Sequence, residues 1–401
     1  MANDRRYLFP VITAMVCVLL YMLYMWLQPV YTYIVLDKRF DAHQYNALFQ
    51  FMAGQTQSLA VYFPFNGRLL VPFLASLISS YDAVFAFQWI NAISIIITFG
   101  FLIYLWNQEN LHPAAIAAGS LWFFVHWKGP VRMYLPDPIT ADVPGYWLLT
   151  LWIILLNRFT GGFWQWSVLI ITACLGTLQK ESFIGITAAS ILWWVWKQKK
   201  EGFPVQVQWP ILTIVLTIIT RALASFYFPP VIQGWKQSSF ITVIKSLWLY
   251  ILEPQRVLLL PMWWLMAYGV FWIGLLLTNV KRDLFYILSI TGILLSAVGG
   301  NDVSRYATTF FPVLMTLILR GVTASKNPGQ MAALILLASL PLSRFWELEP
   351  DLGRFPQQRY QWCVECWSLA ETGLWATYIL LTGWVLYLNN KRQQLRLSES
   401  E

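Results

Sequence analysis

Five short polar segments carry residues that could do chemistry in a chain with only 11% charged residues. They read FDAHQY, NGRLL, LPDPITADVP, LQKESF and NDVSRY, and each stands beside an apolar stretch. Their carboxylates could remove a proton, and their guanidinium and ammonium groups could bind a phosphate. Charged groups are costly at membrane depth and usually mark a path or a site there. The five segments therefore form the candidate site if the fold brings them together.

The candidate proton acceptor is Asp41, in the first of these segments. It begins a stretch whose apolar side chains can lie on a membrane, which would place Asp41 on the polar side of a short helix. Asp37, one helical turn earlier, is the competing candidate. Helix N-capping would explain Asp41 as well. We choose Asp41 as the catalytic base.

Arg68, Lys180 and Arg305 are the candidate phosphate-binding residues. Arg68 and Arg305 each lie near the start of an apolar helix, where a guanidinium group could bind an anion or extend to lipid headgroups. Lys180 is followed directly by Glu181, so we expect the two charges to face a cavity or each other. An exposed ion pair in a tight helical hairpin is the alternative.

Four further residues are expected to support the site. Asp137 and Asp142 flank the sequence PITA in a turn stiffened by prolines, where paired carboxylates could bind a divalent cation or sugar hydroxyls. Turn formation and helix capping would explain both of them. Asp302 could cap the helix whose next turn carries Arg305, and Tyr306 follows that arginine. The ligand set is too small to assign a metal, so a divalent cation stays an open alternative.

The elements that must position these residues are membrane-spanning helices. The chain has 401 residues, of which 58% are hydrophobic, and this is too apolar for a soluble domain. We predict an all-α bundle of about twelve spans with both termini in the cytoplasm, because this orientation places many of the basic connections inside. The spans lie at about 8–28, 83–106, 112–127, 142–157, 164–178, 182–196, 209–226, 257–278, 284–299, 306–320, 331–345 and 370–388.

In this prediction residues 1–401 form one membrane domain, with long outer connections at about 30–82 and 227–256. Each connection is expected to carry a helix that lies on the membrane surface. Residues 69–80 are apolar but short for a span, and residues 235–252 have apolar side chains at helical spacing. Counting 69–80 as a span would reverse the orientation of everything after it. Cys363 and Cys366 form an isolated CxxC pair, which is weak evidence for zinc and leaves a disulfide open.

The set FDAHQY, GRLLVPFLA, LPDPITADVP, LQKESF and NDVSRYATTFFPVL resembles the C-type (GT-C) integral membrane glycosyltransferases. The resemblance implies many spans, interfacial helices in the outer loops, an acidic catalytic residue in the first outer loop, and a polyprenyl-phosphate sugar as donor. By position, Asp41 would be that acid, and Lys180 and Glu181 would match a lysine–glutamate break in a middle outer loop. Arg305 would match an arginine–tyrosine pair that opens a late span. Many members carry two adjacent first-loop acids, whereas Asp37 and Asp41 stand four apart.

We therefore expect a glycosyltransferase that moves a hexose or pentose, with inversion, from a polyprenyl phosphate to a hydroxyl acceptor on a glycan, lipid or protein. The donor must enter from the bilayer and the acceptor from water, so the site belongs at the membrane interface. We expect a bacterial inner or plasma membrane, with the site facing the periplasm or exterior. A transporter, a lipid-sugar flippase or a polysaccharide polymerase is the alternative. Membrane lipids are further expected partners, nucleic acid is not, and the oligomeric state stays open.

Overall fold

The computed structural model describes residues 4–31, 41–204, 206–231, 239–277, 283–298, 303–349 and 367–398. These described residues form helices and connecting loops without a β-strand, which confirms the all-α prediction for them. The α-helices are α1 (Asp4–Leu27), α2 (Asp41–Met52), α3 (Leu70–Ile78), α4 (Ala83–Gln108), α5 (Pro113–Val125), α6 (Asp142–Asn157), α7 (Phe163–Gln179), α8 (Ser182–Lys200), α9 (Gln208–Tyr227), α10 (Ser239–Leu252), α11 (Gln255–Tyr268), α12 (Gly274–Leu277), α13 (Leu284–Val298), α14 (Val303–Thr309), α15 (Phe311–Ala324), α16 (Pro328–Ser343) and α17 (Leu369–Ser398). Three short 3-10 helices are η1 (Phe65–Gly67), η2 (Arg132–Tyr134) and η3 (Gly269–Ile273).

Four helical units are long and apolar enough to cross a membrane. They are α4, α9, the unit Gln255–Leu277 and the part Leu369–Gln393 of α17. Shorter apolar helices, including α5, α6 and α13, accompany them at positions where we predicted spans. The chain is therefore an all-helical protein with several helices suited to a membrane, and twelve crossings stay a prediction.

Two of the predicted spans are interrupted. The segment expected at about 257–278 leaves α-helical geometry after Tyr268, where Gly269 has a φ of +56° that glycine adopts without strain. The segment expected at about 306–320 starts earlier and is divided into α14 and α15 around Phe310. Pro312 lies in the first turn of α15, where its missing N–H is tolerated, so it favours a helix start there over continuation from α14.

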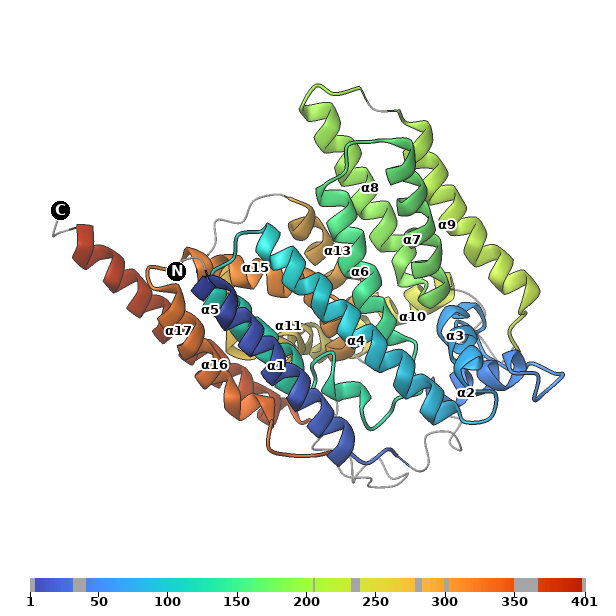
Figure 1. The fold of residues 1–401 in the computed structure, drawn as a ribbon, viewed down its shortest axis with the longest axis horizontal. Coiled ribbons are helices and arrows are strands. Elements are labelled where there is room, and N and C mark those ends of the chain that lie inside the picture. The colour runs from blue at the N-terminus through green and yellow to red at the C-terminus, as the bar shows by residue number, and fades with distance from the viewer. Residues whose placement is uncertain are drawn as a thin grey trace.

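The helices form two groups joined by a central set. α7, α8 and α9 stand together at one end, and α1, α5, α16 and α17 lie at the other, with α4, α6 and α15 between them (Figure 1). Large aromatic side chains such as Trp106, Trp122 and Trp152 are fully buried between the helices. α6 is packed among these helices along its length, and it carries a polar residue at each end, Asp142 and Asn157.

The backbones of α12 and α15 touch where two glycines face each other. A Cβ added to Gly321 would lie 1.7 Å from the carbonyl oxygen of Gly274, and one added to Gly274 would lie 2.2 Å from the carbonyl oxygen of Ile318. Small residues at such crossings allow helix backbones to approach closely in membrane proteins. The C-terminal half of α15 is therefore packed closely against α12.

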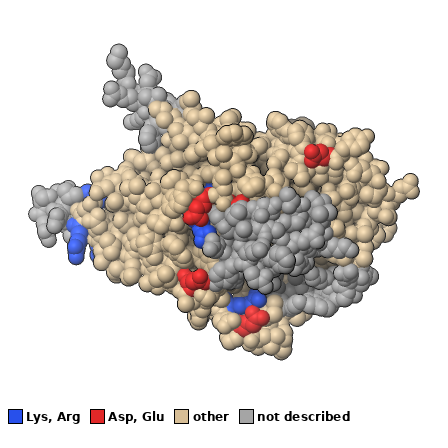
Figure 2. All heavy atoms as spheres, turned by 90° about the horizontal axis from the view of Figure 1, so that it is seen from below, with Lys and Arg blue, Asp and Glu red and all other residues tan. Residues whose placement is uncertain are grey.

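Two helices fall where we predicted elements on the membrane surface. α3 has nine residues, so it is about 14 Å long and too short to cross about 30 Å of hydrocarbon. α10 exposes Ile244, Leu247, Trp248 and Ile251 on one face. Among the described residues drawn in Figure 2, few are charged. The exposed apolar side chains of α10 suit contact with lipid.

Candidate active site

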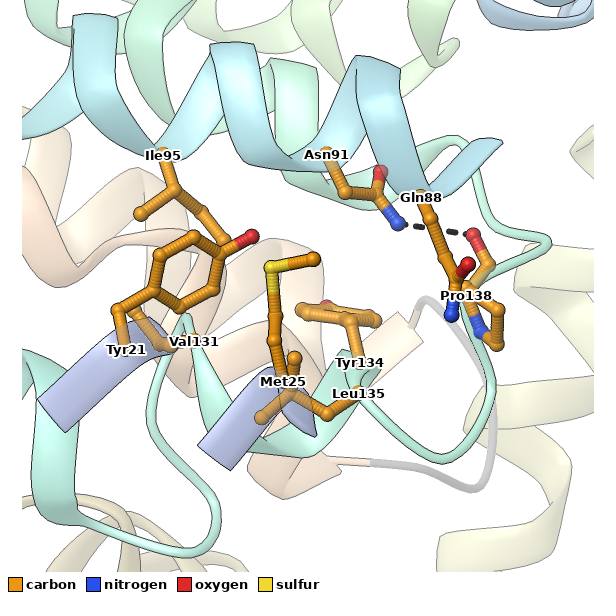
Figure 3. A pocket seen from close by; sticks show the side chains of 9 residues that line it. All are labelled: Tyr21, Met25, Gln88, Asn91, Ile95, Val131, Tyr134, Leu135 and Pro138. Carbon is orange, nitrogen blue, oxygen red and sulfur yellow. Dashed lines mark hydrogen bonds between the residues drawn. The ribbon is translucent and has the colours of Figure 1, made fainter. Parts of the chain in front are cut away.

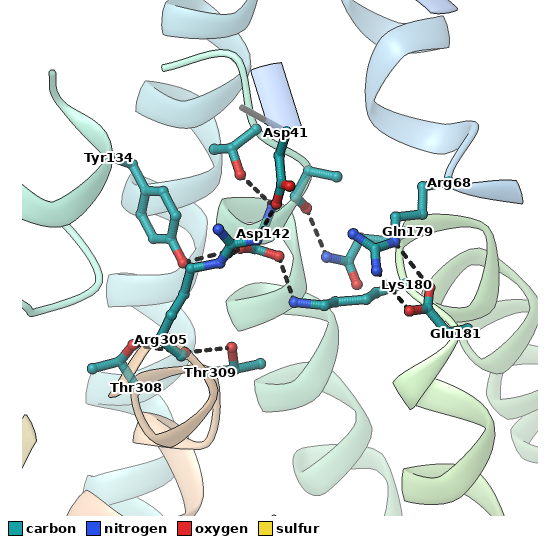
Figure 4. A network of polar contacts seen from close by, with 12 residues as sticks. Asp41, Arg68, Tyr134, Asp142, Gln179, Lys180, Glu181, Arg305, Thr308 and Thr309 are labelled. Atoms are coloured by element: carbon teal, nitrogen blue, oxygen red, sulfur yellow. Dashed lines mark hydrogen bonds and ion pairs between the residues drawn. The ribbon is translucent and has the colours of Figure 1, made fainter. Parts of the chain in front are cut away.

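A chain of ion pairs joins four of the predicted polar segments. Arg305, in α14, lies with Nη2 2.7 Å from Oδ2 of Asp41 and with Nε 2.7 Å from Oδ2 of Asp142. Lys180 donates from Nζ to the other oxygen of Asp142, at 2.8 Å. We call Asp41, Asp142, Lys180 and Arg305 the Asp142 cluster (Figure 4). The cluster brings together residues up to 264 positions apart in the sequence.

Burial within the Asp142 cluster is graded. The side chains of Asp142 and Lys180 are 1% and 3% exposed, whereas those of Arg305 and Asp41 are 23% and 34% exposed. Asp142 is the first residue of α6, where the helix dipole favours a negative charge. The Tyr134 hydroxyl also donates to this carboxylate, at 3.3 Å. Asp142 is therefore the fixed centre of the cluster, and Asp41 is its most accessible member.

A second, partly buried ion pair joins the segments NGRLL and LQKESF. Arg68 donates from Nε and Nη2 to the two carboxylate oxygens of Glu181, at 2.9 and 2.6 Å, and from Nη1 to the Tyr45 hydroxyl at 2.8 Å. Burial would raise the pKa of the Glu181 carboxyl, but the charge and hydrogen bonds of Arg68 prevail and lower it to about 2. Glu181 is thus an anion at physiological pH, and Arg68 is occupied on three nitrogens.

Lys180 and Glu181 do not face each other, although they are neighbours in the sequence. Lys180 ends α7 in an extended conformation, with φ −159° and ψ 135°. Side chains on extended backbone alternate in direction, so consecutive residues reach different partners. Lys180 contacts Asp142 and Glu181 contacts Arg68, which makes this short break the link between the two sets of ion pairs (Figure 4).

The other predicted site residues fall into three groups. Tyr306 lies in α14 with its ring 4.6 Å from Nζ of Lys180, which places it beside the cluster. Asp137 is half-buried in the loop that leads to α6, five residues before Asp142. Asp37 and Asp302 lie outside the described residues, as do Cys363 and Cys366.

Arg221 was not among the predicted site residues. It lies in the apolar helix α9, is 9% exposed, and donates from Nη2 to the carbonyl oxygen of Pro64 at 2.9 Å. A Cβ on Gly67 would lie 1.6 Å from Nη1 of Arg221, so the guanidinium group packs directly on the loop before Arg68 and would have to shift if Gly67 were replaced. An arginine inside an otherwise apolar helix is costly and was the available signal. Tyr45 and Tyr134 carried no such signal, because aromatic residues are abundant throughout this sequence.

A mainly apolar pocket adjoins the Asp142 cluster. It lies between α1, α4 and the loop around η2, and Tyr21, Met25, Ile95, Val131 and Tyr134 contribute to its lining (Figure 3). Its polar contributors include Asn91, which donates to the carbonyl oxygen of Pro138 at 2.8 Å. Tyr134 belongs to both sites, because its ring lines the pocket and its hydroxyl contacts Asp142. The pocket and the ion pairs are therefore adjacent.

A separate charged group lies at the other end of α6 and α15. Arg320 donates from Nε to Glu109 at 3.0 Å and also pairs with Asp283, and Asn157 donates to Glu109 at 3.3 Å. We call Glu109, Asp283 and Arg320 the Arg320 cluster. Because α6 runs from Asp142 to Asn157, about 24 Å of helix separates the two clusters. Among the described residues no group of three or more His, Cys, Asp or Glu side chains is placed to hold a metal ion.

In comparisons with known proteins, no family model, curated protein or solved structure matches the chain.

Proposed function

We propose that the chain is an integral membrane glycosyltransferase that moves a sugar from a polyprenyl phosphate to a hydroxyl acceptor. The observation that carries the proposal is Arg305, a partly exposed cation held between the accessible carboxylate of Asp41 and the buried carboxylate of Asp142. A base and a phosphate-binding group in direct contact are the two parts that such a transfer needs.

In the proposed reaction Asp41 takes the proton of the acceptor hydroxyl while the hydroxyl oxygen attacks the anomeric carbon. The bond from that carbon to the phosphate oxygen breaks, and its electron pair leaves with the polyprenyl phosphate. Arg305 stabilises the charge that develops on this leaving group. Since Asp41 rests on Nη2 of Arg305, a phosphate that binds this nitrogen would displace Asp41 and release its carboxylate for the acceptor.

Lys180 and Arg68 take positioning roles in this proposal. Both are buried and bound to carboxylates, so direct contact with a phosphate would require these ion pairs to open. Lys180 instead fixes Asp142, and Asp142 fixes the orientation of Arg305. Buried partners of this kind hold a reacting group in place before the substrate arrives.

The apolar pocket beside Tyr134 is compatible with a lipid-linked donor. Met25, Ile95 and Leu135 line it, but it encloses only about 20 Å³, so the helices around it would have to move apart to admit a polyprenyl chain. The donor phosphate would then meet the cluster while the chain stays among the helices. An outward-facing site in a bacterial inner or plasma membrane belongs to the same proposal.

The test is transfer by the purified protein in vesicles that contain polyprenyl phosphate linked to a radiolabelled hexose or pentose. We expect release of free polyprenyl phosphate together with label on the acceptor, and Asp41→Asn should lower the rate about 100- to 10,000-fold because the base is lost. Asp82→Asn is the matched control, since Asp82 is an exposed acid whose carboxylate caps α4, and asparagine is an equally good cap. Donor movement across the vesicle without cleavage would identify a flippase, and full activity in Asp41→Asn would remove Asp41 from the mechanism.

A further inference from the structure

An open pocket lies beside the Arg320 cluster, at the opposite end of α6 from the candidate active site. It encloses about 1120 Å³ including its open mouth, and it is lined by the last turns of α6 and α8, the first turn of α13 and Arg320 of α15. Because about 24 Å of helix separates Asn157 in this pocket from Asp142, the pocket is not part of the proposed transfer site.

One stripe of α8 forms the aromatic and cationic wall of the pocket. Trp193, Trp196, Lys197 and Lys200 follow the helical spacing that places side chains on a single face, and all four line the pocket. The ammonium group of Lys197 lies 5.5 Å from the Trp193 ring, and that of Lys200 lies 5.3 Å from the Trp196 ring. Cation–π contacts of this kind hold a lysine side chain over an indole face.

The opposite wall presents a fixed arginine. Arg320 is held by Glu109 and Asp283, and its guanidinium carbon lies 4.4 Å from the centre of the Phe285 ring. Three cations and two carboxylates line the pocket, since Glu201 and Asp283 accompany Lys197, Lys200 and Arg320. Asp283 is engaged by Arg320, and Glu201 lies 4.0 Å from Lys197. The wall formed by α8 therefore carries more positive charge than the wall formed by Arg320 and Asp283.

The wall also contains a polar group that lacks a partner. The indole N–H of Trp193 is buried and has no hydrogen-bond acceptor within the described parts of the chain. This N–H is covered by protein, so it is not a contact for a ligand in the pocket, and the cationic groups of the wall are the ones that a ligand can meet. Phosphate oxygens are strong acceptors and suit the lysines.

We propose that this pocket binds the phosphate headgroup of an anionic membrane phospholipid. Lys197 and Lys200 bind the phosphate, and the acyl chains lie against the exposed apolar side chains of α8, Leu192 and Trp196. Tryptophan and lysine together at a helix end are typical of the membrane–water interface, which favours a lipid over a soluble phosphate compound. The inference does not depend on the proposed transfer reaction.

Native mass spectrometry of the full chain in detergent, titrated with phosphatidylglycerol or phosphatidylcholine, tests the proposal. We expect the wild type to prefer phosphatidylglycerol, and Lys197→Gln/Lys200→Gln to bind it about 10- to 30-fold more weakly, because each lysine near an anionic lipid contributes about tenfold or less. Lys199→Gln is the matched control, since Lys199 is exposed in the same turn of α8 and does not line the pocket.

Several binding outcomes in this titration would overturn the proposal. They are equal binding of the two lipids, an equal loss in Lys199→Gln, and unchanged phosphatidylglycerol binding in the double variant. A parallel titration with inorganic phosphate separates the two sources of the same chemistry. If inorganic phosphate displaces phosphatidylglycerol at equal concentration, the pocket recognises a soluble phosphate and the lipid assignment is wrong. Circular dichroism of each variant establishes that the helices are intact.

Discussion

The Asp142 and Arg320 clusters are built on the same plan but in different surroundings. In each, one arginine of the α14–α15 region bridges two carboxylates that lie far apart in the sequence. Asp142 is almost fully buried and also binds Lys180, whereas Glu109 and Asp283 are 18% and 27% exposed. A bridging arginine alone is therefore no evidence of catalysis. The feature that distinguishes the first cluster is the burial of Asp142 and Lys180, since a pocket adjoins each cluster.

The largest difference between the clusters should appear in the rate of sugar transfer. We expect Arg305→Gln to lower turnover about 100- to 1000-fold, which is typical for removal of a group that stabilises transition-state charge. Arg320→Gln should leave turnover within about threefold, because Arg320 lies a helix length away from the reaction. The measurement is initial transfer rate in vesicles at saturating donor. Equal losses in the two variants would contradict a catalytic role that is particular to Arg305.

The second difference should appear in stability. Asp142→Asn leaves Lys180 buried beside a neutral partner, so we expect the free energy of unfolding to fall by about 3 kcal/mol. Asp283→Asn breaks a more exposed pair and should cost about 1 kcal/mol or less. Thermal unfolding in one detergent, followed by circular dichroism, compares them. A larger loss of stability in Asp283→Asn than in Asp142→Asn would contradict this prediction.

A smaller effect concerns the Arg68–Glu181 pair and pH. The pKa of Glu181 is lowered from 4.5 to about 2, so its stabilising effect is complete above about pH 4.5 and is lost as pH falls towards 2. Glu181→Gln should lower stability by about 2 kcal/mol at neutral pH, and the gap to the wild type should narrow below pH 4.5. Unfolding midpoints from pH 8 to pH 3 test this. A gap that narrows between pH 8 and 6 would contradict the assignment to Glu181.

The smallest expected effect is that of metal removal. Both oxygens of Asp142 already accept from cations, Lys180 on one and Arg305 on the other, so a divalent ion would have to displace them. We expect transfer in vesicles to be unchanged after treatment with EDTA. A loss that magnesium or manganese restores would instead assign a metal to this region.

The sequence was informative about helices and about which segments are polar, but not about which charges pair. Apolar length and proline positions predicted α4, α6 and α9, because helix formation in such segments depends on local composition. The sequence also singled out Asp41, Lys180 and Arg305, which the fold brings together. It did not predict that Lys180 and Glu181 contact different partners, because that depends on the extended backbone of Lys180 at the end of α7. The pairing of Glu109 with Arg320 was also missed, since it depends on long-range packing.

The break between α14 and α15 affects how the two arginines are held. α15 is packed closely at Gly321, whose backbone touches that of α12, whereas Arg305 sits on the separate seven-residue helix α14. The break around Phe310 and Pro312 places the two arginines on separate helices. The direction of Arg305 towards Asp41 is therefore set by the packing of α14 against α11 and α13, whereas the direction of Arg320 is set by the contact of α15 with α12.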